Sequence, residues 1–482
     1  MQIIQVSPEI VPFAKTGGLA DVVGALPKYL HKLGHKVALF MPLYKGVKES
    51  AKTLVSTGQT ITVKIGGTTR NGVIWKSRMP DCPVDIFFIQ HDEYYHRDYL
   101  YTTPEGDYWD NAERFIFFSR GVLEALKVLD LSPDIVHCHD WQSALIPVYL
   151  KTIYHKLFPQ IRTFLTVHNI AYQGVFWHWD MKLTGLDWSL FNWKQLEFWG
   201  KINFLKGGLV FADAINTVSY RYSKEIQTPE FGYGLEGILK EQADKLYGIP
   251  NGVDYTYWNP AKDNLIPANY KNTDLKGKAT CKTALQDRLG LSKVKVPLLG
   301  MITRLTVQKG LDLLTDIFEE LMKLDLQLVI LGTGEEKYQA RLRELGTRYP
   351  GKVSVNIAFD NQLAHLITAG ADIYLMPSKY EPCGLNQLYA LKYGTIPIVR
   401  ETGGLADTVV NYSAETTKQD TATGFSFRNY SSRELLDMIK LALQVYQDKK
   451  RWLTLMKSGM KQDWSWSRSA QEYQTLYQKL IS

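Results

Sequence analysis

Short apolar runs alternate with helical patterns along most of the 482-residue chain. This alternation is typical of βαβ units, in which helices cover both faces of a parallel sheet. In the first half we expect strands at Ile3–Val6, Val37–Phe40, Ile86–Ile89, Ile135–His137, Thr163–Val167 and Ala214–Thr217. In the second half we expect them at Leu298–Ile302, Leu326–Leu331, Val353–Ile357, Ile373–Met376 and Ile396–Val399. The pattern predicts the α/β fold class, with two doubly wound domains.

The two series of strands are separated by Asn251-Gly252-Val253-Asp254, where we expect a hinge. Domain one would span residues 1–253 and domain two residues 254–460. The last segment, 461–482, carries apolar side chains at helical spacing: Tyr473, Leu476, Tyr477, Leu480 and Ile481. Because the second domain has little need of another helix, we expect this segment to cross back onto the first domain.

The charge balance excludes some classes of protein. The chain has 56 basic and 49 acidic side chains, a net charge of +7, which is too small for a dedicated nucleic-acid binder but suits anionic small molecules. No apolar run reaches the roughly 18 residues of a membrane helix, and the N-terminus is typical of a strand rather than a signal peptide. We therefore expect no membrane partner and a cytoplasmic location, or a plastid one if a transit peptide has been removed. The four cysteines are widely spaced, which disfavours a disulfide framework or structural zinc.

One motif occurs twice. Thr16-Gly17-Gly18-Leu19-Ala20-Asp21 recurs as Thr402-Gly403-Gly404-Leu405-Ala406-Asp407, each time after a predicted strand and at the start of a helix. A glycine-rich turn at a helix N-terminus presents backbone N–H groups that can hold an anion. A single copy could equally be a tight turn, but two copies favour two ligand-facing loops. Lys15 adds a cation beside the first copy.

Two cations, Arg304 and Lys309, follow the predicted strand Leu298–Ile302. Open α/β sheets bind ligands at the carboxyl ends of their strands, so these side chains could neutralise a diphosphate leaving group without a metal. The alternative, a solvated charged face, remains open at this point.

Glu381-Pro382-Cys383-Gly384-Leu385 follows another predicted strand. Proline suits the first turn of a helix, so we expect the N–H groups of Cys383, Gly384 and Leu385 to point outward at a helix N-terminus. That arrangement could hold a phosphate or sugar hydroxyls, with the Glu381 carboxylate beside it. The alternative is a helix start with a favourable acidic residue.

Two predicted strands end in polar side chains. His137 and His139 share one strand face, but no third ligand has suitable spacing, so we expect no metal site. We expect four residues to line a polar pocket instead, with His168 donating to a sugar oxygen: Asp140, Trp141, His168 and Asn169. Gly332-Thr333-Gly334 lacks the third glycine of the dinucleotide fingerprint, which disfavours a nicotinamide enzyme, and we expect no cofactor.

Taken together, these motifs resemble those of the bacterial glycogen synthases and plant starch synthases. The segments that carry the resemblance are Lys15–Asp21, His139–Trp141, Thr166–Asn169, Gly232–Gly237, Asn251–Asp254, Arg304 with Lys309, Glu381–Leu385 and Thr402–Leu405. The resemblance covers nearly the whole chain. It implies a GT-B fold with two Rossmann-like domains facing across a deep cleft. It also implies transfer of glucose from ADP-glucose, with retention, to the non-reducing end of an α-1,4-glucan, and it leaves granule association open.

The resemblance also implies roles for single residues. Lys15, Arg304 and Lys309 would bind the diphosphate, Glu381 would hold glucose, and Phe359 would stack on adenine. The other residues implied to bind substrate are Gly17, Gly18, Asp21, Tyr95, Trp141, Asn169, Asn251, Cys383, Gly384, Leu385, Thr402 and Gly403. The residues implied to act in catalysis are Lys15, Asp140, His168, Arg304, Lys309 and Glu381.

Related transferases that use sucrose or mannose often carry a second glutamate eight positions after the first, where this chain has Tyr389. No side chain stands out as a nucleophile for double displacement, so we favour a front-face mechanism in which the leaving ADP accepts the proton of the incoming hydroxyl. Asp140 is the alternative for a direct role. A transferase that uses UDP-glucose and a non-catalytic glucan-binding protein also remain open.

Overall fold

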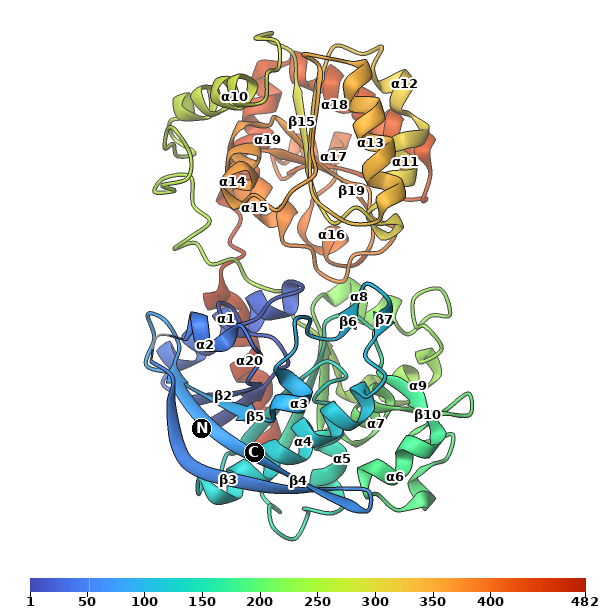
Figure 1. The fold of residues 1–482 in the computed structure, drawn as a ribbon. Coiled ribbons are helices and arrows are strands. Elements are labelled where there is room, and N and C mark those ends of the chain that lie inside the picture. Colours follow the sequence, from blue (N-terminus) through green and yellow to red (C-terminus); the bar gives the residue numbers. More distant parts are fainter. Residues whose placement is uncertain (52) are drawn as a thin grey trace. The chain divides into compact units, whose positions relative to one another are not determined.

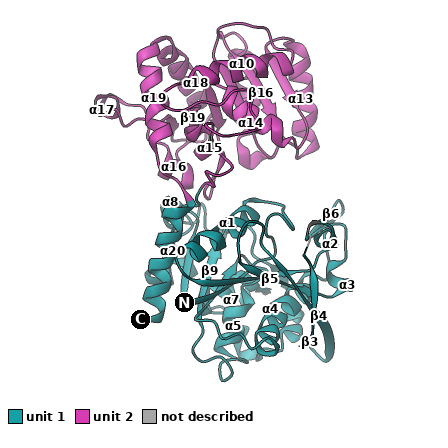
Figure 2. Ribbon diagram, turned by 90° about the vertical axis from the view of Figure 1, so that its left-hand side faces the viewer, with its two compact units in different colours: residues 1–252, 466–482 teal, residues 253–465 magenta. Residues whose placement is uncertain are grey.

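The computed structural model describes residues 1–51 and 53–482 and divides the chain into two compact units. Unit 1 comprises Met1–Gly252 and Trp466–Ser482, and unit 2 comprises Val253–Ser465 (Figure 2). The second division lies after Ser465 rather than after residue 460, because Trp464 still packs in unit 2 against Val253, Leu388 and Leu391.

The main sheet of unit 1 has nine strands within the described residues, in the order β14-β13-β9-β8-β1-β2-β5-β4-β3. Its strands are β1 (Gln2–Val6), β2 (Lys36–Pro42), β3 (Val55–Ile65), β4 (Thr68–Arg78), β5 (Asp85–Gln90), β8 (Ile135–His139), β9 (Arg162–Val167), β13 (Ala214–Thr217) and β14 (Leu246–Gly248). All pairs from β14 to β5 are parallel, whereas β4 and β3 add antiparallel strands at one edge. The chain winds outward in both directions from the neighbours β1 and β8, which is the doubly wound arrangement.

The six strands predicted in the first half are confirmed, because buried parallel strands are nearly continuous apolar runs. The long β3–β4 hairpin, drawn in blue in Figure 1, was not predicted. Its outer strand is mostly exposed and polar, although Gly66-Gly67 at the turn is a typical hairpin signal. Two small sheets were also missed: β10 (Val175–Trp177) with β11 (Glu197–Phe198) and β12 (Lys201–Asn203), and β6 (Thr102–Thr103) with β7 (Gly106–Asp107).

Helices cover the sheet of unit 1. They are α1 (Gly18–Lys32), α2 (Val47–Ser50), α3 (Asp92–Tyr95), α4 (Asn111–Val128), α5 (Leu145–Lys151), α6 (Met181–Thr184), α7 (Phe204–Phe211), α8 (Tyr220–Glu225), α9 (Glu236–Glu241) and α20 (Trp466–Ile481), with 3-10 turns η1 (His178–Asp180), η2 (Trp188–Leu190) and η3 (Ala243–Lys245). The C-terminal helix α20 packs against α1 and buries Tyr473 and Tyr477 completely in the unit 1 core.

The sheet of unit 2 has six parallel strands within the described residues, in the order β17-β16-β15-β18-β19-β20. They are β15 (Leu298–Ile302), β16 (Gln327–Leu331), β17 (Val353–Asn356), β18 (Ile373–Met376), β19 (Ile396–Arg400) and β20 (Phe425–Phe427). The five strands predicted for this half are confirmed, and β20 was missed. Numbered along the chain, the order is 3-2-1-4-5-6, so its winding reverses between β15 and β18.

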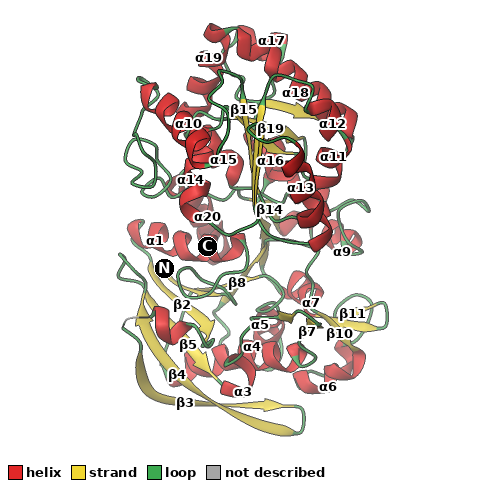
Figure 3. Cartoon of the chain, turned by 45° about the horizontal axis from the view of Figure 1, so that its top comes forward, coloured by secondary structure: helices red, strands yellow, loops and turns green. Residues whose placement is uncertain are grey.

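Helices cover both faces of this sheet, as Figure 3 shows around β15 and β19. One apolar cluster includes side chains from α11, α12, α13 and α18, and another includes side chains from α10 and α14. The helices of unit 2 are α10 (Lys276–Arg288), α11 (Leu311–Asp316), α12 (Phe318–Leu321), α13 (Glu336–Arg348), α14 (Asn361–Gly370), α15 (Asn386–Lys392), α16 (Gly403–Thr408), α17 (Ala414–Lys418), α18 (Ser432–Gln447) and α19 (Lys449–Lys461), with the 3-10 turn η4 (Val307–Lys309).

Among the described residues, none forms a helix that is both long and apolar enough to cross a bilayer.

Candidate functional site

In unit 2, a cation and a carboxylate meet where the winding of the sheet reverses. Lys309 lies at the end of η4, after β15, and Glu381 lies in the loop after β18. The Lys309 Nζ and a Glu381 carboxylate oxygen are 2.6 Å apart, with 15% and 8% of their side chains exposed. The Ser378 hydroxyl donates to the same oxygen at 3.0 Å. Because neighbouring strands carry both loops, the fold itself brings these side chains together.

Hydrogen bonds from helix α15 fix the loop from Glu381 to Gly384. Gln387 on α15 is fully buried, and its amide nitrogen donates to the carbonyls of Cys383 and Gly384, both at 3.0 Å. The same nitrogen lies 3.2 Å from the Thr408 hydroxyl on α16. Sequence reasoning missed both Gln387 and Ser378, since their roles appear only when separate segments converge.

The prediction that Pro382 starts a helix is wrong. Helix α15 begins at Asn386, and the residues before it form bends. Gly384 has φ +70°, the left-handed region, which a right-handed helix cannot contain. The backbone N–H groups of Cys383 to Leu385 therefore belong to a loop and its junction with α15. Cys383 is buried, while Gly384 and Leu385 are partly exposed.

The second Thr-Gly-Gly copy packs beneath this loop. A Cβ on Gly403 would lie 2.0 Å from the Glu381 carbonyl oxygen, and one on Gly404 would lie 2.1 Å from that of Cys383. The Gly404 N–H donates to the Glu381 carbonyl at 3.1 Å. Thr402 and Gly403 are both buried. The expectation of a ligand-facing loop is therefore wrong for Gly404, because its N–H is already used to hold the Glu381 loop.

Two further predicted residues lie on the surface of unit 2. The Arg304 side chain is exposed and approaches the Gln308 side chain at 3.5 Å. Phe359 follows β17 and is 89% exposed, so its ring is available to a ligand. Tyr389, which replaces the second glutamate of related transferases, stacks on Trp258 with ring centroids 4.0 Å apart.

In unit 1, the first Thr-Gly-Gly copy is organised by Glu9, a residue that sequence reasoning missed. Glu9 follows β1 and is 4% exposed. Its carboxylate accepts hydrogen bonds from the N–H and hydroxyl of Thr16, from the Gly17 N–H at 3.3 Å and from the Tyr101 hydroxyl at 2.9 Å. The sequence does contain a signal for Glu9, since it is an acidic residue shortly after the first predicted strand.

The glycines of this copy face open space. Apart from the adjacent residues of the chain and the backbone of α1 itself, no described atom lies within 4 Å of a Cβ built on Gly17 or Gly18. Lys15 is exposed beside them and forms an ion pair with Asp21 at 2.7 Å. This loop therefore keeps the exposed backbone and the cation that an anionic ligand needs.

Asp140 and His168 follow the strands β8 and β9. The Asp140 carboxylate accepts the His168 backbone N–H at 2.7 Å. Burial raises the pKa of Asp140 to about 8, and the nearby charge of Glu9 acts in the same direction. Burial lowers the pKa of His168 to about 3, so this imidazole is neutral at pH 7. A neutral imidazole can donate a hydrogen bond from one ring nitrogen and accept one at the other.

Four more predicted residues of unit 1 differ in their burial and in their hydrogen bonds. Tyr95 lies fully in the core with its hydroxyl donating to the Arg114 carbonyl, so the expectation that it faces a ligand is not met. Trp141 is 9% exposed and packs edge-on against Phe115. The Asn169 side chain accepts the Ala171 N–H at 3.1 Å. Asn251 is buried, and its side-chain oxygen has no hydrogen-bond partner among the described residues.

The histidine pair on β8 is hydrogen-bonded to neighbouring side chains. His137 lies 2.6 Å from the Thr166 hydroxyl, and His139 lies 3.0 Å from the His168 ring. Across the part of the chain that the structure describes, no group of three potential metal ligands gathers.

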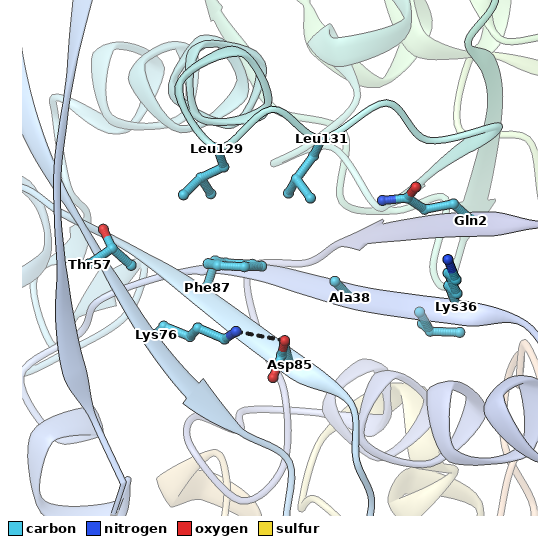
Figure 4. A pocket seen from close by; sticks show the side chains of 10 residues that line it. Gln2, Lys36, Ala38, Thr57, Lys76, Asp85, Phe87, Leu129 and Leu131 are labelled. Carbon is cyan, nitrogen blue, oxygen red and sulfur yellow. Dashed lines mark ion pairs between the residues drawn. The ribbon is translucent and has the colours of Figure 1, made fainter.

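A pocket of about 420 Å³ lies at the opposite edge of the unit 1 sheet, where β1, β2 and β5 begin. Figure 4 shows Phe87 and Leu129 lining it and the ion pair between Lys76 and Asp85 beside them. Because ligands of doubly wound sheets bind at the carboxyl ends of the strands, this pocket is separate from the candidate site.

Comparisons with known proteins agree with this geometry. Residues 2–241 match the model of the starch synthase catalytic domain, and residues 286–454 match that of glycosyl transferases group 1. The chain is 47% identical to a glycogen synthase of Koribacter versatilis, covering 99% of this chain and 98% of the relative, and 48% identical to one of Fervidobacterium nodosum, covering 100% and 99%. The chain belongs to the glycogen and starch synthase family.

Two solved structures share the fold of this chain. The catalytic domain of starch synthase IV from Arabidopsis thaliana, bound to ADP and acarbose, superposes with a TM-score of 0.91 at 33% identity and 99% coverage of both chains. A sucrose-phosphate synthase from Thermosynechococcus elongatus shares the fold, with a TM-score of 0.60 at 17% identity, covering 100% of this chain and 99% of that one. The chain is a glycosyltransferase with the GT-B fold.

Proposed function

We propose that this glycosyltransferase moves glucose from ADP-glucose, with retention, to the non-reducing-end 4-hydroxyl of an α-1,4-glucan. The observation that carries the proposal is the Lys309–Glu381 ion pair, 2.6 Å long, at the reversal point of the unit 2 sheet. It combines a cation for a diphosphate with a carboxylate for sugar hydroxyls at the edge where such sheets bind ligands.

The leaving group makes the main electrostatic demand. Breaking the bond from glucose to ADP places negative charge on the diphosphate, and preorganised cations stabilise such charge most where water is scarce. Lys309 is mostly buried and held by Glu381, whereas Arg304 is exposed and can move toward a ligand. We assign both to the diphosphate and assign Lys309 the larger share. No metal ion is needed in this scheme.

The Glu381 loop and Phe359 would hold the ends of the donor. The Glu381 carboxylate would accept sugar hydroxyls, and the partly exposed Gly384 and Leu385 would offer backbone groups. The exposed Phe359 ring would stack on adenine. Thr402, Gly403 and the buried Cys383 would support the loop.

Unit 1 would supply Lys15, the open backbone of Gly17 and Gly18, and the neutral His168. We favour a front-face reaction, in which the bond from the anomeric carbon to the ADP oxygen breaks as the acceptor oxygen bonds to the same carbon. The acceptor proton then passes to the leaving phosphate oxygen. Asp140 keeps a structural role, because its carboxylate is already bonded to the His168 backbone.

Exposed tryptophans favour a polymeric acceptor. Five tryptophans within 23 residues of unit 1 are exposed to solvent: Trp177 (61%), Trp179 (43%), Trp188 (43%), Trp193 (65%) and Trp199 (83%). Flat rings with a polar edge suit the faces of sugar rings. We propose that this surface supports association with glucan granules, and co-sedimentation with granules after Trp177→Ala and Trp199→Ala substitutions tests it.

We place the reaction in the cytoplasm. The four cysteines are free in the structure. Reducing compartments keep thiols in that state.

Initial rates with ADP-, UDP- and GDP-glucose test the donor assignment. We expect the highest kcat/KM with ADP-glucose and maltoheptaose. A higher kcat/KM with UDP-glucose would move the chain to the alternative donor class. Binding of glucan without transfer from any donor would identify a non-catalytic glucan-binding protein.

A further inference from the structure

One face of the unit 1 sheet near His168 holds several buried polar rings. His137 and His139 lie on one face of β8, their ring centroids 4.1 Å apart, and both are fully buried. Helix α20 covers this face with Tyr473 and Tyr477, which are also fully buried. Buried polar groups are costly unless they are hydrogen-bonded, so an extended network here specifies one arrangement.

The network determines where the His137 proton lies. The Asn216 amide nitrogen donates to the Thr217 carbonyl at 3.4 Å, so its oxygen faces Thr166 and accepts that hydroxyl at 2.5 Å. Having donated its proton, the Thr166 oxygen can only accept from His137 Nε2, 2.6 Å away. The other nitrogen, Nδ1, must accept from the Tyr477 hydroxyl at 2.7 Å. Tyr477 therefore holds His137 in its neutral Nε2–H form.

A separate hydrogen bond places the proton of His168, on the ring next to His137. His139 Nδ1 lies 3.0 Å from His168 Nε2, while His139 Nε2 is buried without a hydrogen-bond partner among the described residues. A buried N–H without an acceptor is rarer than a bare acceptor, so the His139 proton belongs on Nδ1 and is donated to His168. His168 then carries its own proton on Nδ1, the nitrogen left for a ligand.

We propose that His139 is a positioning residue that makes His168 a hydrogen-bond donor through Nδ1, and that His137, held by Tyr477 of the C-terminal helix, supports the His139 ring by packing against it. In the proposed transfer reaction, on which this inference rests, His168 would donate to a sugar hydroxyl. Neither His139 nor Tyr477 would touch the substrate. The C-terminal helix thereby contributes to the site as well as to the core.

Three variants separate positioning from packing. His139→Leu removes the donor, and we expect kcat to fall about tenfold with little change in KM, as for the loss of one oriented hydrogen bond. His139→Asn keeps an N–H near the Nδ1 position and should restore kcat to within about threefold. Tyr477→Phe keeps the ring and should lower kcat by about threefold. The matched control is Tyr149→Phe, a fully buried tyrosine of unit 1 that donates to the Thr184 carbonyl.

The tautomer of His168 can be measured by NMR spectroscopy without an activity assay. In protein labelled with ¹⁵N-histidine, we expect the His168 signal, assigned by its loss in His168→Gln, to report the Nδ1–H form in the wild type. This spectrum stands even if no transfer is found, so failure of the proposed function is distinguishable from failure of this inference.

An Nε2–H signal for His168 in the wild type would overturn the inference. So would an unchanged kcat in His139→Leu, or a His139→Asn variant as slow as His139→Leu. If His139→Leu does not fold, as judged by circular dichroism, the wild-type spectrum decides the question.

Discussion

The same six residues, Thr-Gly-Gly-Leu-Ala-Asp, do different physical work in the two units. In unit 1, Gly17 and Gly18 face open space and are fixed from one side by the Glu9 carboxylate. In unit 2, Gly403 and Gly404 lie so close to the Glu381 loop that a side chain would overlap its carbonyls. The glycines of the first copy leave space for a ligand. Those of the second copy have no side chain and so allow the Glu381 loop to pack directly against their backbone. Sequence identity between short motifs therefore does not establish a shared role.

We expect the largest effect from a substitution of Lys309. Its partner Glu381 lies in the loop against which the second Thr-Gly-Gly copy packs. We expect Lys309→Ala to lower kcat at least about a hundredfold, because it removes a preorganised charge from the leaving diphosphate. Steady-state kinetics measures this, with the exposed Lys323→Ala of unit 2 as the control. A melting temperature close to that of the wild type would show that the loss is catalytic. Near-normal turnover would contradict the role of Lys309.

Substitution of a glycine by alanine should lower the free energy of unfolding in the second copy but hardly change it in the first. Gly403→Ala combines φ +46° with a Cβ 2.0 Å from a carbonyl oxygen, so we expect a loss of at least about 2 kcal/mol in the free energy of unfolding. Gly17→Ala should change this free energy by less than about 0.5 kcal/mol and should instead weaken ligand binding. Urea denaturation measures both. Equal losses would remove the distinction between the two copies.

Glu9 should matter for binding more than for folding. Glu9→Gln keeps the size of the side chain but replaces one acceptor oxygen by an NH₂ group that faces donors. We expect KM for the donor to rise about tenfold, as for the loss of about 1.4 kcal/mol of hydrogen bonding. The exposed Glu230→Gln is the control. An unchanged KM would mean that the first copy does not depend on Glu9.

The smallest effect concerns pH. Folding raises the pKa of Asp140 from 3.8 to about 8, so the folded state binds more protons between these values. The contribution of Asp140 to stability is therefore greatest below pH 4 and is lost as the pH rises toward 8. Asp140→Asn keeps the oxygen that accepts the His168 N–H, and its stability relative to the wild type should increase from pH 5 to pH 8. A constant difference in urea denaturation would contradict the assigned pKa.

Much of the fold could be predicted because buried parallel strands are apolar runs with helices between them. The β3–β4 hairpin was missed because its outer strand is polar. Local patterns also placed Lys309 and Glu381 at strand ends, where topology brings them together. Burial was harder to predict: Tyr95 lies deep in the core. The supporting residue Gln387 acts through contacts with distant segments, which no local pattern encodes.

The central claim is that the chain extends α-1,4-glucans with glucose from ADP-glucose. The most direct test incubates the wild-type protein with labelled ADP-glucose and maltoheptaose, and then digests the product with an enzyme specific for non-reducing-end α-1,4 linkages. We predict label in chains at least one glucose longer and complete release of that label on digestion. Label that is not transferred, or that resists digestion, would contradict the account.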